Sequence, residues 1–133
     1  MKTATIALYL GLAFYAPKET PAPQYDRKTE IDLTGNLVKV YQAGGPLAGT
    51  YATIETKGGT FEVYFAPASF VQMLDIPLKA GLRDVGVTGS KIAVEDKTVI
   101  LAREVRIEKT FYSLRDANGG ANWLWTRPIP TGL

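Results

Sequence analysis

The stretch Tyr51-Ala-Thr-Ile-Glu-Thr56, Lys57-Gly58-Gly59 and Thr60-Phe-Glu-Val-Tyr-Phe65 contains two alternating segments on either side of a Gly-Gly pair. Apolar and polar residues alternate with period two in both segments, which is typical of β-strands with one buried face. Two such segments joined by a short glycine-containing turn predict a β-hairpin. After Pro67, apolar residues fall at positions 70, 71 and 74, so residues 68–75 are predicted to form one short helix.

Strand patterns continue on both sides of this hairpin. Upstream, residues 31–41 predict one long strand with Gly35 in its interior, where a glycine marks a bulge or a sharp bend. Downstream, strands are predicted over residues 83–90, 91–94, 98–107 and 110–115, with a turn at 95–97.

The predicted order is a long bent strand, a hairpin, a short helix and then further strands. Small all-β chains must protect their sheet edges, and closure into a barrel does so. A five-stranded barrel with one helix between its third and fourth strands is an OB-fold, which is therefore the predicted architecture. A β-sandwich is the alternative, but it needs no helix at this position and more strands.

Four short segments also resemble a group of exported bacterial OB-fold proteins of uncharacterised function, which are often labelled nucleic-acid-binding. The segments are Phe65-Ala-Pro-Ala-Ser-Phe70, Val87-Thr-Gly-Ser-Lys91, Ile100-Leu-Ala-Arg-Glu-Val105, and Leu114-Arg-Asp-Ala-Asn-Gly119 followed by Trp123. The resemblance covers residues 31–125 and implies the same fold and export. Ala66 stands where the group has glycine, and the spacing from Gly119 to the tryptophan differs. A fold alone does not establish an activity.

The composition argues against catalysis. Cysteine and histidine are absent, so thiolate nucleophiles, imidazole bases and the usual zinc ligand sets are excluded. The acidic groups at Glu95-Asp96 and at Asp116 with Asn118 lie in turn-like sequence, where such side chains commonly bond backbone amides. We therefore expect no enzyme activity, no catalytic residues, no metal and no cofactor.

The net charge of +2 comes from the first 29 residues, which hold four basic and two acidic side chains. Residues 30–133 hold 11 of each sign and are neutral in total. Binding to a phosphate backbone normally leaves a basic surface on the folded domain. A nucleic-acid partner is therefore disfavoured, although a local basic patch stays open.

The N-terminal sequence has the pattern of a targeting segment. A positive start precedes an apolar run over residues 4–16 that ends at Pro17, which predicts a signal peptide or an uncleaved anchor. The run is shorter than the ~17–25 residues of a spanning helix. Apolar residues in this run also alternate with period two, so a strand that pairs with a neighbouring molecule is a second interpretation. A buried helix is the third. The alternating apolar residues proposed as partner contacts are Leu8, Leu10, Leu12 and Phe14.

Four regions follow from these patterns. Residues 1–16 are the signal-like or assembly segment, 17–29 a proline-rich linker, 30–116 the OB-fold barrel, and 117–133 a tail containing tryptophan. We expect a chain that is periplasmic, or anchored in the membrane and facing the periplasm.

Four aromatic residues are the candidate contacts outside the N-terminus. Tyr51 and Tyr64 are expected to face outward on the hairpin strands, where an OB-fold binds its ligands. They are either ordinary surface residues or contacts for a protein, a sugar or a nucleic acid. Trp123 and Trp125 either fold back on the barrel or contact a partner or a membrane.

The sequence therefore predicts a non-enzymatic binding or adaptor module at the bacterial envelope. It would serve as an accessory or assembly subunit of a larger membrane-associated or filamentous complex, with another protein or its own copies as partner. Membrane contact through residues 4–16 is open. The alternative is an OB-fold module that binds single-stranded nucleic acid, supported by the fold and the two tyrosines.

Overall fold

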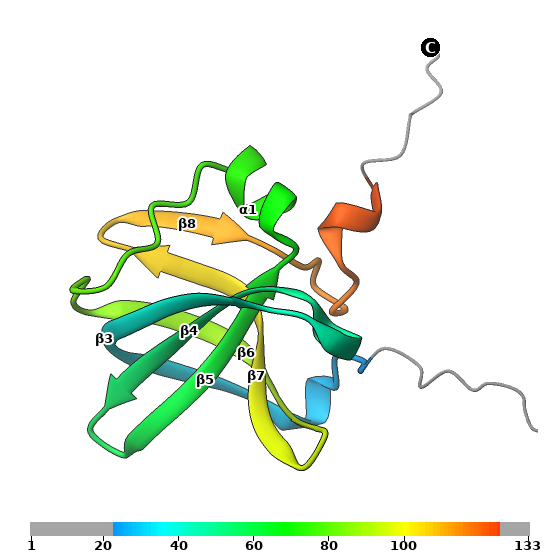
Figure 1. The fold of residues 1–133 in the computed structure, drawn as a ribbon, viewed down its shortest axis with the longest axis horizontal. Coiled ribbons are helices and arrows are strands. Elements are labelled where there is room, and N and C mark those ends of the chain that lie inside the picture. The colour runs from blue at the N-terminus through cyan, green and yellow to red at the C-terminus, as the bar shows by residue number, and fades with distance from the viewer. Residues whose placement is uncertain (1–22, 126–133) are drawn as a thin grey trace, which may run out of the picture.

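The computed structural model describes residues 23–125, apart from the side chain of Trp125. Six strands, one short α-helix and three 3-10 turns follow one another in a predominantly β structure (Figure 1). In chain order they are η1 (Arg27–Thr29), β3 (Glu30–Ala43), η2 (Gly45–Leu47), β4 (Gly49–Thr56), β5 (Gly59–Ala66), α1 (Ala68–Met73), β6 (Val85–Val94), β7 (Lys97–Ile107), β8 (Thr110–Ser113) and η3 (Asn122–Trp125).

The strands form one sheet in the order β5-β4-β3-β6-β7-β8. Strand β3 pairs with two different strands along its length. Its first half pairs with β6, up to Gly35 opposite Val85, and its second half pairs with β4, from Asn36 opposite Glu55 onward. The long strand therefore joins the hairpin of β4 and β5 to the hairpin of β6 and β7, and Figure 1 shows it strongly curved.

The sheet also folds back on itself. Strand β5 pairs in parallel with β7, but only at Val63 with Ile100 and at Tyr64 with Leu101. All the other strand pairs are antiparallel. Five strands thus form a ring of pairings that is closed over a short stretch, while β8 extends the sheet beyond β7.

Two glycines allow the strands to come this close together. A Cβ atom on Gly35 would lie 2.2 Å from the carbonyl oxygen of Glu55, and one on Gly89 would lie 2.4 Å from that of Leu101. Both approaches are far shorter than atoms tolerate, so both positions require glycine. Gly89 lies at a shift of register between β6 and β7, where the sheet bends.

The principal core fills the inside of the curved sheet. Its fully buried side chains include Phe65, Leu37, Ile54, Ile100 and Leu114, none more than 1% exposed. Helix α1 contacts β4 and β5 and buries Phe70 and Val71 in this core. The predicted helix between the third and fourth strands is therefore confirmed.

The segment before β3 is bonded to the sheet. The backbone N–H of Asp26 donates to Ser90 Oγ at 3.0 Å, and Tyr25 Oη donates to Glu30 at 2.6 Å. Glu30 in turn accepts from Arg103 Nε at 3.0 Å, which together with the Tyr25 bond lowers the pKa of this carboxyl group. The described part of the predicted linker, residues 23–29, is thus bonded to β6 and to the start of β3, where Glu30 also binds Arg103 of β7.

Two boundaries differ from the sequence prediction. The strands predicted over residues 83–90 and 91–94 are one continuous strand, β6, because its pairing with β7 runs without interruption past Ser90. The strand predicted over residues 110–115 is β8, and it brings the sheet to six strands, whereas a five-stranded barrel was predicted. The predicted N-terminal segment over residues 1–16 lies outside the described residues.

We expect Gly35→Val to lower the free energy of unfolding by about 3 kcal/mol or more, because the new side chain must displace the β4 backbone. Chemical denaturation of the full chain measures this effect. Gly44→Val is the matched control, since a Cβ at Gly44 meets nothing within 4 Å and its φ is −98°. Equal stability of the two variants would contradict the account of Gly35 given above.

Candidate functional site

A row of aromatic rings crosses the outer side of the sheet. Tyr41 stacks on Tyr51 with ring centroids 5.4 Å apart, and Tyr51 meets Tyr64 edge-on at 5.2 Å. Tyr64 then meets Trp123 at 6.3 Å, and Trp123 lies 5.7 Å from Phe70. We call the four rings Tyr41, Tyr51, Tyr64 and Trp123 the aromatic row. It links strands β3, β4 and β5 to the C-terminal turn η3.

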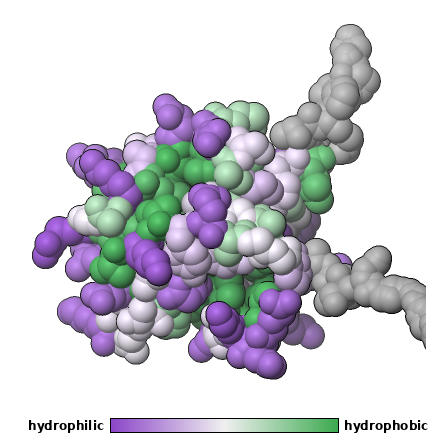
Figure 2. Space-filling model, viewed as in Figure 1, coloured by the Kyte–Doolittle hydropathy of each residue, from purple (hydrophilic) through white to green (hydrophobic). Residues whose placement is uncertain are grey.

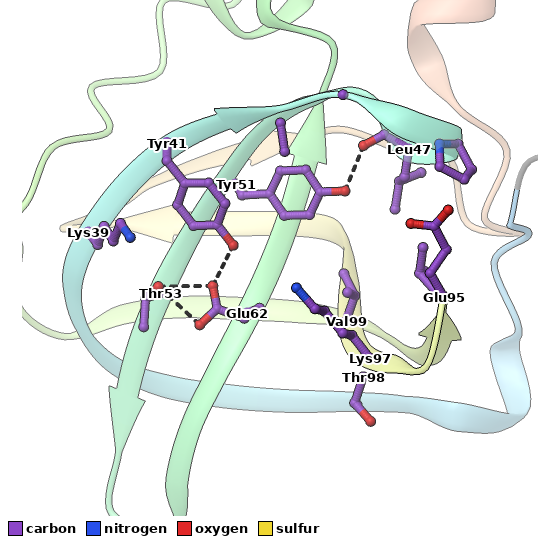
Figure 3. Close-up of a pocket in the computed structure, with 14 residues that line it drawn as sticks. Lys39, Tyr41, Leu47, Tyr51, Thr53, Glu62, Glu95, Lys97, Thr98 and Val99 are labelled. Carbon is purple, nitrogen blue, oxygen red and sulfur yellow. Dashed lines mark hydrogen bonds between the residues drawn. The ribbon is translucent and has the colours of Figure 1, made fainter.

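A groove of about 590 Å³ opens at the Tyr41 end of this row. It lies between the segment that joins β3 to β4 and the turn that joins β6 to β7, and Figure 3 shows the two tyrosine rings on one side and the β6–β7 turn on the other. We call it the tyrosine groove. The side chains that define it are Lys39, Tyr41, Leu47, Tyr51, Thr53, Glu62, Glu95, Lys97, Thr98 and Val99.

The polar groups on the floor of the groove are bonded to one another. Glu62 accepts hydrogen bonds from Tyr41 Oη at 2.6 Å and from Thr53 Oγ1 at 2.9 Å (Figure 3). Tyr51 Oη donates to the carbonyl oxygen of Leu47 at 2.6 Å. These bonds hold the two tyrosine rings and the Glu62 carboxylate in fixed positions, which is an arrangement suited to recognition by shape.

Burial and these bonds keep the tyrosines protonated. Desolvation, with the Glu62 hydrogen bond second, raises the pKa of Tyr41 well above its usual range. Desolvation also raises the pKa of Tyr51, and it raises that of Tyr64 to about 12. Neutral tyrosines at physiological pH donate hydrogen bonds and offer ring faces, but they are poor nucleophiles and bases.

The charges that line the groove balance. Lys39 and Lys97 are opposed by Glu62 and Glu95, so the groove has no net charge. The Lys39 ammonium lies 5.1 Å from the centre of the Tyr41 ring, a cation–π contact. A polyanion is therefore not favoured by this groove over a neutral or mixed-charge partner.

Tyr51 and Tyr64 are not the surface residues that the strand alternation suggested. They point away from the principal core as expected, but they are only 8% and 2% exposed. Leu47, Val99, Leu101 and Trp123 pack with them in a second cluster on the outer side of the sheet. The expectation of open stacking faces on both rings is wrong, because side chains from other segments of the chain cover them. Their role as partner contacts stays a prediction.

The structure places Trp123 against the sheet and helix α1. Its ring is partly buried, packs against both clusters and lies 5.0 Å from the guanidinium carbon of Arg115. Of the two alternatives for this residue, packing against the chain's own surface therefore describes the structure. The side chain of Trp125 and residues Leu8, Leu10, Leu12 and Phe14 lie outside the description, and their predicted role as contacts stays a prediction.

Two important residues were missed as site residues. Tyr41 forms one wall of the groove, and its place could have been inferred from the register that sets β3 beside β4. Arg115 follows the last strand, and its Nη1 donates to the carbonyl oxygen of Gly119 at 2.9 Å. Its burial, with 7% exposure, had no signal in the sequence.

The turn at Asp116 has the structural role that was predicted for it. Its Oδ1 accepts from the backbone N–H groups of Asn118 and Gly120, each at 2.9 Å. Across residues 23–125, no group of three or more acidic side chains lies close enough to hold a metal ion.

The same residues contain no helix of the length and apolarity needed to cross a membrane. Figure 2 shows one face of the protein, largely hydrophilic with apolar surface between the charged side chains.

Comparison with known proteins identifies the family. The sequence model of the MamS/MamX magnetosome protein family matches residues 30–112. The chain belongs to this family. The match begins at the first residue of β3 and ends within β8, so the MamS/MamX region includes the ring of strands and the tyrosine groove. No curated protein matches the chain significantly.

In this MamS/MamX chain, Trp123 lies beyond the matched region but packs on it. We expect Trp123→Ala to lower the free energy of unfolding by roughly 2–4 kcal/mol, because the contacts with Tyr64 and Phe70 are lost. Denaturation of the full chain measures this loss. Phe111→Ala is the control, since Phe111 is 62% exposed on β8 and should cost less than about 1 kcal/mol. A Trp123 variant as stable as the control would show that the Trp123 ring does not stabilise the folded chain.

The raised tyrosine pKa values predict that the folded chain loses stability at high pH. Tyr64 has a pKa of about 12 in the folded chain and about 10 when unfolded. Its contribution to stability is therefore complete below pH 10 and is lost as the pH rises from 10 through 12. Urea denaturation between pH 9 and pH 12 should show this loss, and Tyr64→Phe should reduce its slope. An unchanged slope in the variant would contradict the assignment to Tyr64.

Proposed function

We propose that the chain is a non-enzymatic adaptor that binds another protein of a magnetosome-associated assembly through the tyrosine groove. The observation that carries this proposal is the groove itself, in which Tyr41, Tyr51 and Glu62 are fixed by their own hydrogen bonds. Groups held in this way present a rigid surface and lose little entropy when a partner binds. Membership of a magnetosome protein family supports a role in a larger assembly.

We also propose that the barrel is an OB-fold. The order of the ring, β3-β4-β5-β7-β6, and the parallel pairing of β5 with β7 support this architecture, as does the position of α1 between the third and fourth strands of the ring. The tyrosine groove then lies on the face and between the loops that such barrels use for binding. Attachment to a membrane and location in the bacterial envelope are part of the same proposal, supported by the apolar run over residues 4–16.

Site-specific photocrosslinking tests the adaptor role. A photoreactive amino acid at Lys97, in the groove, is compared with one at Lys109, in the exposed turn between β7 and β8, in a magnetosome-forming bacterium that carries the chain. We expect a discrete adduct with another protein from position 97, and its loss when Tyr41→Ala is added. Equal adducts from both positions, or none from position 97, would refute the groove as a binding surface.

Single-strand nucleic-acid binding is the second candidate, favoured by the aromatic rings beside Lys39 and Lys97. A labelled oligothymidine titrated with the full chain distinguishes it, since such binding weakens steeply as salt rises. We expect no binding with this salt dependence, because Glu62 and Glu95 cancel the two lysines. Salt-sensitive binding that Tyr41→Ala removes would favour the nucleic-acid role over the adaptor role.

A further inference from the structure

A second hollow of about 610 Å³ lies at the other end of the aromatic row. The start of the described chain, the segment between β3 and β4, and residues 115–124 surround it. We call it the Arg115 pocket. Its lining includes Pro23, Tyr25, Pro46, Tyr64, Arg115 and Trp123. Arg115 is the single charged residue among these described lining residues, and most of the others are apolar or aromatic.

Arg115 is buried without a carboxylate partner. Its residue is 7% exposed, and the ion pairs found among residues 23–125 join Glu30 to Arg27 and Arg103 and leave Arg115 out. Its Nε atom is buried and has no hydrogen-bond partner. Desolvation lowers the pKa of this guanidinium, as expected for a cation removed from water. A buried charge of this kind normally has an opposite charge beside it.

The surroundings hold the guanidinium in place but do not neutralise it. Its carbon lies 5.0 Å from the Trp123 ring centre and 5.6 Å from the Tyr25 ring centre. Nη1 donates to the carbonyl oxygen of Gly119, whose φ of +91° and contact with Tyr25 exclude a side chain at that position. The nearby Asp116 forms no ion pair with Arg115: its Oδ1 accepts from two backbone N–H groups of its own turn, and its charge attracts the guanidinium without a direct contact. The loop is thus built around a fixed, unpaired cation.

We propose that the Arg115 pocket binds a carboxylate carried on an apolar segment of a partner protein. A guanidinium matches a carboxylate in shape and charge, and the prolines and aromatic rings of the lining suit an apolar body attached to it. The cation–π contacts do not supply hydrogen-bond acceptors for the N–H groups of the guanidinium. The oxygens of a carboxylate would supply them. The inference is independent of the adaptor role of the tyrosine groove, because it is argued from Arg115 and its surroundings alone. Its test measures the binding of a small molecule at Arg115 and does not involve the groove.

The test follows the Arg115 Nε–H resonance by NMR in the full chain. N-acetyl-leucine is the probe, and N-acetyl-leucinamide is its uncharged match. We expect the carboxylate probe to shift this resonance and to change tryptophan fluorescence with a saturating dependence, while the amide does neither. Arg115→Lys should weaken binding at least tenfold, whereas Arg83→Lys, at an exposed arginine before β6, should leave it unchanged.

Each other outcome overturns the proposal. No shift with N-acetyl-leucine, or an equal shift with the amide, would show that Arg115 is structural. Equal binding of inorganic phosphate would show a site for any oxyanion. A resonance that moves with Glu19→Gln in the absence of probe would show that the chain's own carboxylate fills the pocket. If Arg115→Lys does not fold, the resonance of the unsubstituted chain still decides between these results.

Discussion

The exchange of partners along β3 is the constraint on which the rest of the structure depends. One strand serves two hairpins only if its backbone passes within contact distance of β4 just where it leaves β6, and Gly35 is the residue at that point. The curvature brings β5 round to β7, where two residue pairs close the ring. Without the bend at Gly35, the strands would form an open sheet, and the core side chains would lose one of their two walls.

The same curvature explains why the outer side of the sheet carries a second cluster. Leu47 and Trp123 come from segments that follow the ends of β3 and β8, and both fold over tyrosines of β4 and β5. Their packing leaves hollows on either side of the segment that joins β3 to β4, since Leu47 lines the tyrosine groove and the Arg115 pocket alike. The two hollows are therefore consequences of one layer of side chains added outside the curved sheet.

Local patterns predicted most of the fold. Period two over residues 51–65 and the apolar spacing after Pro67 depend on neighbours in the sequence, and the hairpin and α1 follow from them. The burial of Tyr51 and Tyr64 could not be predicted in this way. Alternation shows only that their rings point away from the principal core. The residues that cover Tyr64 include Trp123, which is distant from it in the sequence. Long-range contacts of this kind have no local period.

Arg115 illustrates the same limit for the candidate sites. In the sequence it stands among other arginines, lysines and acidic residues near the end of the chain, and the ordinary expectation for such a run is a solvated surface. Arg103 and Arg106 have partners in Glu30 and in the carbonyl oxygens of Asp84 and Glu108. Arg115 differs because the chain turns after β8 and places its guanidinium beside the Trp123 ring, where it forms no ion pair with a described carboxylate. Residues 30–133 are therefore neutral in total although they contain a buried cation in an apolar pocket. What this surface binds depends on that local charge and not on the total charge.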